Sequence, residues 1–320
     1  MPFVLNRLIQ MIIVLFILSF VVFMLIDLMP GDATTRLKME NPGIKKDDLN
    51  RLVKLRGLDR PARVQYFFWL KRVIQGDLGY SITYKIPVKE MIADKLITTL
   101  KLAIPVLILT LAIAVPIGII AGIRQYSVFD YSVNLLAFIG FSVPTFVLGL
   151  LAILFFAQYL NLFPPIGLGT PENDDWLDQV QYLVLPVLTL SFYDTGNWVR
   201  YIRGTLLEVI KQDYIRTARA KGLPEDVVIV KHAMRNILIP FITIFALSIP
   251  VLFSGALITE KVFGIQGMGH LLYDSATSSD TDVAMAAFLF IAMLTLFFNF
   301  LADILYTVVD PRVRIKGRKG

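Results

Sequence analysis

The 320-residue chain contains no cysteine and only two histidines, His232 and His270. Without cysteine it has no disulfide, no thiolate metal ligand and no thiol nucleophile. Neither histidine has a second ligand-type residue at metal-site spacing. The chain also lacks the GxxxxGK[ST] motif, in which backbone amides and a lysine hold nucleotide phosphates. We therefore expect no catalytic residue, no metal site and no cofactor in this chain.

Charge is scarce as well. Only 18 % of the residues are charged and 56 % are apolar, whereas soluble domains carry about 25 % charged residues. The mean hydropathy is +0.67, and the net charge of +6 is a small excess for so long a chain. This composition excludes a disordered chain and makes a nucleic-acid partner unexpected. It is typical of a membrane protein.

Long apolar runs predict an all-α membrane protein with six transmembrane helices, since about 20 apolar residues in helical form cross a bilayer. A sixth run, Val180 to Tyr193, reaches that length only if the helix includes Asp194 and continues to Arg200. The five runs free of charge are Leu8 to Ile26, Leu102 to Ile123, Val133 to Leu160, Ile237 to Thr259 and Val283 to Ala302.

Lysine and arginine place both termini in the cytoplasm, because short cytoplasmic loops retain cations. With that orientation the inner side holds Arg7, Arg124, the eight cations from Arg200 to Arg235 and the five after Asp310, while the short outer loops hold only Lys261. The segment Gly31 to Lys95 must then lie outside despite fourteen cations. At 65 residues it exceeds the roughly 60 residues within which loop charge controls orientation.

This topology divides the chain into four parts. Residues 1–30 form the N-terminus and first span, which we expect to be retained because no small-x-small cleavage site follows it. Residues 31–95 are an extracellular insertion, and 96–310 a five-helix core with a cytoplasmic loop at 204–236. Residues 311–320 are a basic cytoplasmic tail.

Within the insertion, Asp59 and Pro61 favour a helix start and Gly76 a helix end. Four aromatic residues, Tyr66 to Trp69, lie between them beside two cations. This composition fits a helix at the membrane surface, and it fits equally a small cap packed on itself.

The loop from Asp213 to Asn236 predicts two short helices that meet at a glycine. Asp213 can cap a helix from Tyr214 to Lys221, Gly222 can close it in the left-handed conformation, and Pro224 can open the second helix. A stiff polar corner under a helical bundle suits a cytoplasmic partner that moves, although a solvated basic loop would also obey the charge rule. Small residues, Ala218, Ala220 and Gly222, leave room for a partner's surface.

The loop resembles the EAA loop of ABC-importer membrane subunits. Arg216-Thr217-Ala218 stands where the triplet that gives the EAA motif its name falls, and only the final alanine of that triplet is kept. Gly222 matches the motif's fixed glycine, and Pro240 its closing proline, at the longer spacing of the peptide and nickel permease branch. The rest of the chain resembles that branch almost throughout, in the segments RLIQMIIVLFILSFVVFMLIDLMPGD, GLDRPARVQYFFWLKRVIQGDLGYS, GFSVPTFVLGL, EKVFGIQGMGHLLYDSATSSD and LADILYTVVDPRVR.

The resemblance implies a type I ABC-importer permease in a bacterial or archaeal cytoplasmic membrane, one of two permeases of a di- or oligopeptide importer. Its implied partners are a second homologous permease, two cytoplasmic ATPases that carry ATP and Mg, an extracellular substrate-binding protein and the peptide. The implied ATPase-coupling residues are Asp213, Tyr214, Arg216, Thr217, Ala218, Ala220, Lys221, Gly222 and Leu223.

Polar residues within the spans are candidates for the translocation path, because burying an ionisable group in a bilayer is costly. Asp194 and Asn197 are the first candidates, although Asp194 equally suits a packing role in the bundle. Ser142, Thr145 and Ser254 are further wall positions, beside Pro144 and Gly255.

Other functions remain open at this point. An ion-gradient-driven transporter needs a relay of buried charges, for which two membrane-embedded acids give thin support. A permease for nickel or another small solute fits the same motifs. A serine hydrolase built on Ser254 lacks a histidine in any span.

Overall fold

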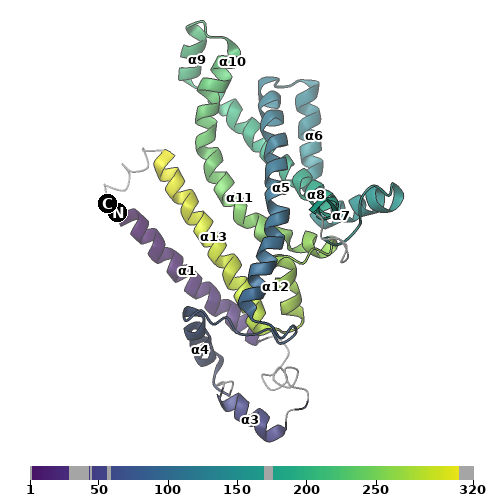
Figure 1. Ribbon diagram of the computed structural model, residues 1–320. Helices are drawn as coiled ribbons and strands as arrows, with labels where there is room; N and C mark the ends of the chain where they lie inside the picture. The colour runs from purple at the N-terminus through teal and green to yellow at the C-terminus, as the bar shows by residue number, and fades with distance from the viewer. Residues whose placement is uncertain (1, 29–42, 44, 56–58, 169–175, 310–320) are drawn as a thin grey trace. The chain divides into compact units, whose positions relative to one another are not determined.

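The computed structural model describes residues 2–28, 43, 45–55, 59–168 and 176–309 (Figure 1). Within these ranges the chain is helical and has no strand, so the predicted all-α class is confirmed for them. The predicted tail, 311–320, lies outside the described residues. The helices are α1 (Pro2–Asp27), α3 (Lys46–Leu55), α4 (Ala62–Ile74), α5 (Val88–Ile123), α6 (Val128–Ser142), α7 (Thr145–Ala152), η1 (Ile153–Tyr159), α8 (Trp176–Ile210), α9 (Asp213–Ala220), α10 (Glu225–Val227), η2 (Val228–Ala233), α11 (Met234–Val262), α12 (Met268–Thr277) and α13 (Thr281–Val309).

Three helices in the described part of the chain are long and apolar enough to cross a membrane: Val4–Ile26, Val88–Ile123 and Thr281–Leu305. The bent pair Val128–Ser142 and Thr145–Tyr159 makes a fourth candidate if the two helices are counted as one span. Helix α8 carries charged side chains, and several side chains of α11 lie outside the description. The six-span count therefore stays a prediction.

The expected span from Val133 to Leu160 is not one continuous helix. The run is broken between α6 and α7, and the two segments differ in direction by 99°. Val143 is extended (φ −89°, ψ 127°) because the proline that follows it disfavours the helical conformation. Pro144 then occupies the N-cap position of α7, where its missing N–H costs no helical hydrogen bond.

The described residues divide into two compact units, of which the first contains residues up to Thr99 and 266–300. In this unit α4 packs on α1 through Tyr66, which is fully buried. The Tyr66 hydroxyl lies 2.8 Å from the Ser19 hydroxyl, and its ring packs in T-shaped contacts with the rings of Phe16, Phe20 and Phe23. Two of the four aromatic residues of α4 thus pack inward, Tyr66 and Trp69, while Phe67 and Phe68 are exposed.

Asp280 organises the other end of this unit. Its carboxylate accepts hydrogen bonds from the Ser81 hydroxyl (2.6 Å) and the Thr83 backbone N–H (3.2 Å). Nearby, the start of α12 is fixed by the Met268 N–H, which donates to the Thr99 hydroxyl at 2.8 Å. These bonds join the turn after α4 to the residue before α13, and α5 to the start of α12.

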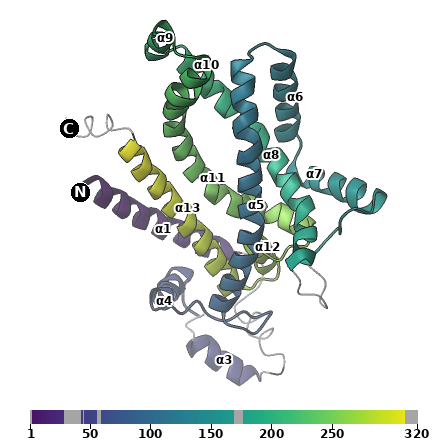
Figure 2. The same cartoon turned by 45° about the horizontal axis from the view of Figure 1, so that its top comes forward.

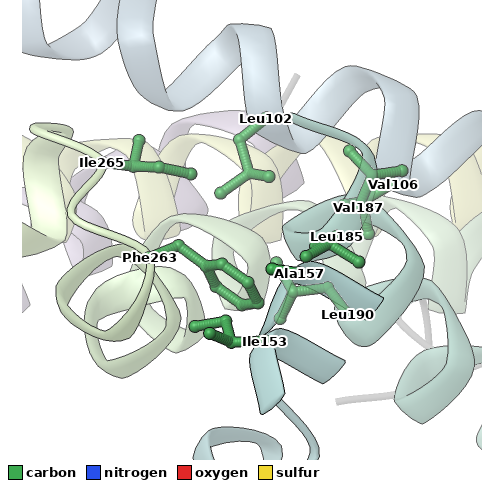
Figure 3. Close-up of a cluster of buried hydrophobic side chains, with 9 residues drawn as sticks. All are labelled: Leu102, Val106, Ile153, Ala157, Leu185, Val187, Leu190, Phe263 and Ile265. Carbon is green, nitrogen blue, oxygen red and sulfur yellow. The ribbon is translucent and has the colours of Figure 1, made fainter. Parts of the chain in front are cut away.

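The second unit contains residues 100–265 and the chain from Leu301 onward. Its helices approach closely at glycines: a Cβ on Gly196 of α8 would lie 2.7 Å from the Ala137 carbonyl of α6, and one on Gly118 of α5 would lie 2.9 Å from the Ile202 side chain. A buried cluster, drawn in Figure 3, joins α5, η1, α8 and the turn that follows α11: Leu102, Val106, Ile153, Ala157, Leu185, Val187, Leu190, Phe263 and Ile265. The loop between α11 and α12 contains a turn with Gly264 at φ +64°.

Helices α9 and α10 lie beyond the C-terminal end of α8 and the N-terminal end of α11. In Figures 1 and 2 they stand at the end of the second unit at which α5 turns into α6. The second unit therefore carries one short helical projection at that end.

Candidate functional site

The projection begins with α9, an eight-residue helix whose first residue is Asp213. The prediction that Asp213 caps this helix is wrong, because Gln212 occupies the cap position and no side chain there accepts a hydrogen bond. Asp213 instead lies in the first turn, with Oδ1 3.6 Å from Nη1 of Arg216. Its negative charge there interacts favourably with the positive end of the helix dipole. The Thr217 hydroxyl donates to the Asp213 carbonyl at 2.9 Å.

Gly222 closes α9 as predicted, with φ +76°. A Cβ there would meet nothing within 4 Å, so the position is open to its surroundings. Across this corner Arg219 holds Glu225 in two hydrogen bonds, Nε–Oε2 at 3.1 Å and Nη2–Oε1 at 2.5 Å. These bonds lower the pKa of the Glu225 carboxyl and raise that of the Arg219 guanidinium.

The second helix starts after Pro224 as predicted, but it is not a separate short helix. Helix α10 continues without a break into the π-helical segment η2 and then into α11. The projection is therefore one short helix folded back onto the start of a long one. A displacement of α9 would act directly on the first turns of α11.

Ile215 and Ala218 attach α9 to this long helix. Both are buried in a cluster with residues of α8, η2 and α11: Leu206, Val209, Val228, Ala233 and Ile237. Ala218 faces this cluster and is only 5 % exposed, so it offers no surface to a partner. The exposed coupling candidates are Asp213, Tyr214, Arg216, Thr217, Ala220, Lys221, Gly222 and Leu223.

A buried ion pair braces the helices behind the projection. The Arg203 guanidinium of α8 bonds both carboxylate oxygens of Asp130 in α6, at 2.5 and 2.7 Å. Asp130 also accepts from the Asn134 amide (2.7 Å) and the Tyr126 N–H (3.0 Å). Sequence reasoning counted Arg203 as a loop cation and missed Asp130. A local signal existed, since Ser127 three residues earlier caps α6.

Asp194 and Asn197 line one cavity of about 290 Å³ between α5, α8 and α11. The cavity lies wholly within the second unit. Its walls comprise three polar residues besides Asp194 and four apolar or aromatic ones: Thr110, Asn197, Ser248, Leu107, Trp198, Tyr201 and Ile244.

Two other path candidates, Ser142 and Thr145, are not brought to this cavity. Ser142 and Thr145 lie on either side of the break between α6 and α7, and neither lines it. Ser254 lies in α11, but its side chain is outside the described residues. The roles of these three residues stay predictions.

Comparison with known proteins identifies the family to which the chain belongs. Residues 114–315 match the family described as "Binding-protein-dependent transport system inner membrane component". Residues 1–103 match the N-terminal region of such components. The chain belongs to this family. The match from 114 onward includes the whole projection, the ion pair behind it and most of the helices that enclose the cavity.

Two curated relatives of this permease are similar over almost their whole length. The oligopeptide transport system permease protein AppB of Bacillus subtilis is 39 % identical over 313 residues, 97 % of this chain and 98 % of the relative. The dipeptide transport system permease protein DppB of Escherichia coli is 32 % identical over 339 residues, 99 % of each chain. The chain is thus a multi-pass membrane permease of the ABC-importer type.

Among solved structures, the permease is similar to a chain of the MetNI methionine ABC transporter in an inward-facing conformation. The TM-score is 0.56 at 16 % sequence identity, and the match covers 69 % of this chain and 97 % of the other. This similarity supports the fold of an ABC-importer permease.

Proposed function

We propose that the chain is a permease subunit of an ATP-driven importer of di- or oligopeptides. The observation that carries this proposal is the similarity along the whole chain to permeases named for oligopeptide and dipeptide transport. The family description itself names dependence on a binding protein, which fits delivery of the cargo by a soluble protein. The cargo of this chain is accordingly a peptide.

The proposed assembly has five further components around this chain: a second homologous permease, two ATPases that carry ATP and Mg, a substrate-binding protein on the outer side and the peptide. This chain contributes half of the path and no catalytic residue, cofactor or metal. It lies in the cytoplasmic membrane of a bacterium or archaeon.

The projection is the proposed contact with an ATPase. Its exposed residues surround Gly222, where the backbone is open to an approaching surface. Because α9 is anchored through Ile215 and Ala218 to the start of α11, a movement of the ATPase would be passed to that helix. Rotation of α11 against α8 would open or close the path between them.

The proposed topology has six spans, with α8 and α11 among them, both termini in the cytoplasm and residues 31–95 outside. The natural absence of cysteine provides a direct test. In intact cells, an impermeant maleimide should label Gly76→Cys but label Gly222→Cys only after the membrane is opened. Labelling of Gly222→Cys from outside would contradict the topology.

Uptake by the reconstituted complex tests the function. Proteoliposomes with both permeases, the ATPases and the binding protein should accumulate tri-alanine when ATP is supplied to the ATPase side, and not with a non-hydrolysable analogue. Accumulation driven by an ion gradient alone would favour a secondary transporter. Transport of a nickel chelate in place of any peptide would favour the small-solute alternative.

A further inference from the structure

The cavity between α5, α8 and α11 contains a carboxylate without an intramolecular partner. Asp194 is the single charged residue among the described residues that line it. In the part of the chain that the structure describes, Asp194 forms no hydrogen bond and no ion pair. Arg200, six residues later on the same helix, lies 4.7 Å from the ring of Phe141 instead. A carboxylate therefore faces the cavity with no cation among the described residues that line it.

Thr110 presents a second unused group to the same cavity. Its side chain is 1 % exposed, and Oγ1 has no hydrogen-bond partner among the described residues. A buried hydroxyl without a partner lowers stability, so its place in the cavity wall points to a ligand that bonds it. The Asn197 amide, one helical turn from Asp194, likewise forms no hydrogen bond with a described residue.

The remaining walls favour an organic cation over a metal ion. Trp198 and Tyr201 bring aromatic rings to the cavity, and Leu107 and Ile244 bring aliphatic side chains. Aromatic faces attract ammonium groups. Divalent cations require several oxygen ligands, whereas the cavity has one carboxylate and the described residues contain no group of three His, Cys, Asp or Glu at metal-binding distance.

We propose that this cavity binds a primary ammonium group, with Asp194 as its counter-ion and Thr110 and Asn197 as hydrogen-bond acceptors. The proposal rests on the proposed function, because a peptide carries such a group at its N-terminus and on lysine side chains. A cavity of about 290 Å³ is at the lower end of the ~300–1,000 Å³ of ligand pockets. It therefore holds one end of a peptide.

Equilibrium binding of tri-alanine to the intact permease–ATPase complex in lipid nanodiscs, without the binding protein, tests this proposal. We expect Asp194→Asn to weaken the binding at least tenfold. Glu208→Gln, which removes an exposed carboxylate from the same helix, should leave it unchanged. N-acetyl-tri-alanine should bind weakly and equally to the wild type and to Asp194→Asn.

Two further arms identify the source of the ammonium group and separate binding from folding. An N-acetylated peptide with a C-terminal lysine should regain affinity that depends on Asp194 if the lysine side chain can enter, and should bind like N-acetyl-tri-alanine if the site accepts only the N-terminus. Thr110→Val keeps the shape and removes the hydroxyl. It should weaken tri-alanine binding at least threefold while the complex melts at the same temperature or higher.

Tri-alanine binding that is unaffected by both Asp194→Asn and Thr110→Val would overturn the proposal. If Asp194→Asn does not assemble, Thr110→Val alone decides. If the wild-type complex imports tri-alanine with ATP, and both variants bind tri-alanine as tightly as the wild type, this inference is overturned but the proposed function stands. A complex that imports no peptide overturns both.

Discussion

Asp130 shows how one buried carboxylate can secure two helices. Its side chain is 2 % exposed, that of Arg203 is 21 % exposed, and the two meet in a bidentate pair. Such a pair contributes little net stability compared with apolar residues, but removal of one partner leaves the other charge buried and uncompensated. The pair therefore specifies how α6 and α8 are aligned behind the projection.

Arg203→Ala should destabilise the permease by about 3–5 kcal/mol, because Asp130 then keeps its charge without a cation. Thermal melting of the purified complex, followed by fluorescence-detected gel filtration, measures the effect. Asp130→Asn combined with Arg203→Gln should recover much of the loss, since neither charge remains. Arg200→Ala, which removes a cation that lies over Phe141, is the control and should change the melting temperature little.

The Arg219–Glu225 pair is more exposed, at 41 % and 52 % of the two side chains, so its contribution is about 0.2–1 kcal/mol. Because its pKa is lowered in the folded loop, Glu225 stabilises the loop fully above its ordinary pKa. The contribution is lost as the pH falls through the lowered value.

Glu225→Gln should therefore speed hydrogen exchange of the α9 amides at pH 7 by up to about fivefold relative to the wild type, since about 1 kcal/mol corresponds to that factor. The ratio of variant to wild-type rates should approach one below the pKa of Glu225. A ratio that is independent of pH would show that the pair does not stabilise the corner.

At the scale of whole elements, α6 and α8 approach closely because Gly196 has no side chain to separate them. A Cβ at that position would lie 2.7 Å from the Ala137 carbonyl, which belongs to the backbone and has little room to move. Small residues allow this kind of close helix packing in membranes, where van der Waals contact replaces the hydrophobic effect. Gly140 of α6 is a second close approach, since a Cβ there would lie 3.2 Å from the Phe192 carbonyl of α8.

Gly196→Ala should lower the stability of the complex by about 1–3 kcal/mol, as overpacking does. Gly204→Ala is a matched control on the same helix, since a Cβ there meets nothing within 4 Å. It should be neutral or stabilise by about 0.5–1 kcal/mol through helix propensity. Equal effects of the two substitutions in a thermal melt would show that the close approach is not tight.

At the scale of the molecule, features set by neighbouring residues were predictable. Gly222 and Pro224 mark the corner because each fixes its own backbone conformation. Pro144 indicates that the helix can kink there, but the 99° change of direction does not follow from apolar content, which records length and not orientation. The Asp130–Arg203 pair joins residues 73 positions apart, and no local pattern specifies such a partner.

The packing of the helices against one another decided which residues form the site, and the sequence predicts this only in part. Asp194 and Asn197 reach one cavity because they lie nearly one turn apart on α8, a spacing that the sequence contains. That Thr110 of α5 and Ser248 of α11 face the same cavity depends on how three helices pack. Ala218 looked available to a partner by size alone, yet packing buries it.

The central claim is that separate ATPases operate this permease through the corner at Gly222. It is tested most directly by the number of tri-alanine molecules imported per ATP hydrolysed in proteoliposomes. Gly222 and Gly76 form a matched pair, because both have a positive φ (+76° and +83°) and open space where a Cβ would lie. Only Gly222 lies in the projection.

We expect Gly222→Leu to lower the import per ATP at least tenfold while the complex still assembles and hydrolyses ATP, because the added side chain occupies the space that the ATPase contacts. Gly76→Leu should retain the wild-type ratio. A Gly222→Leu complex that imports as many peptides per ATP as the wild type would contradict the account.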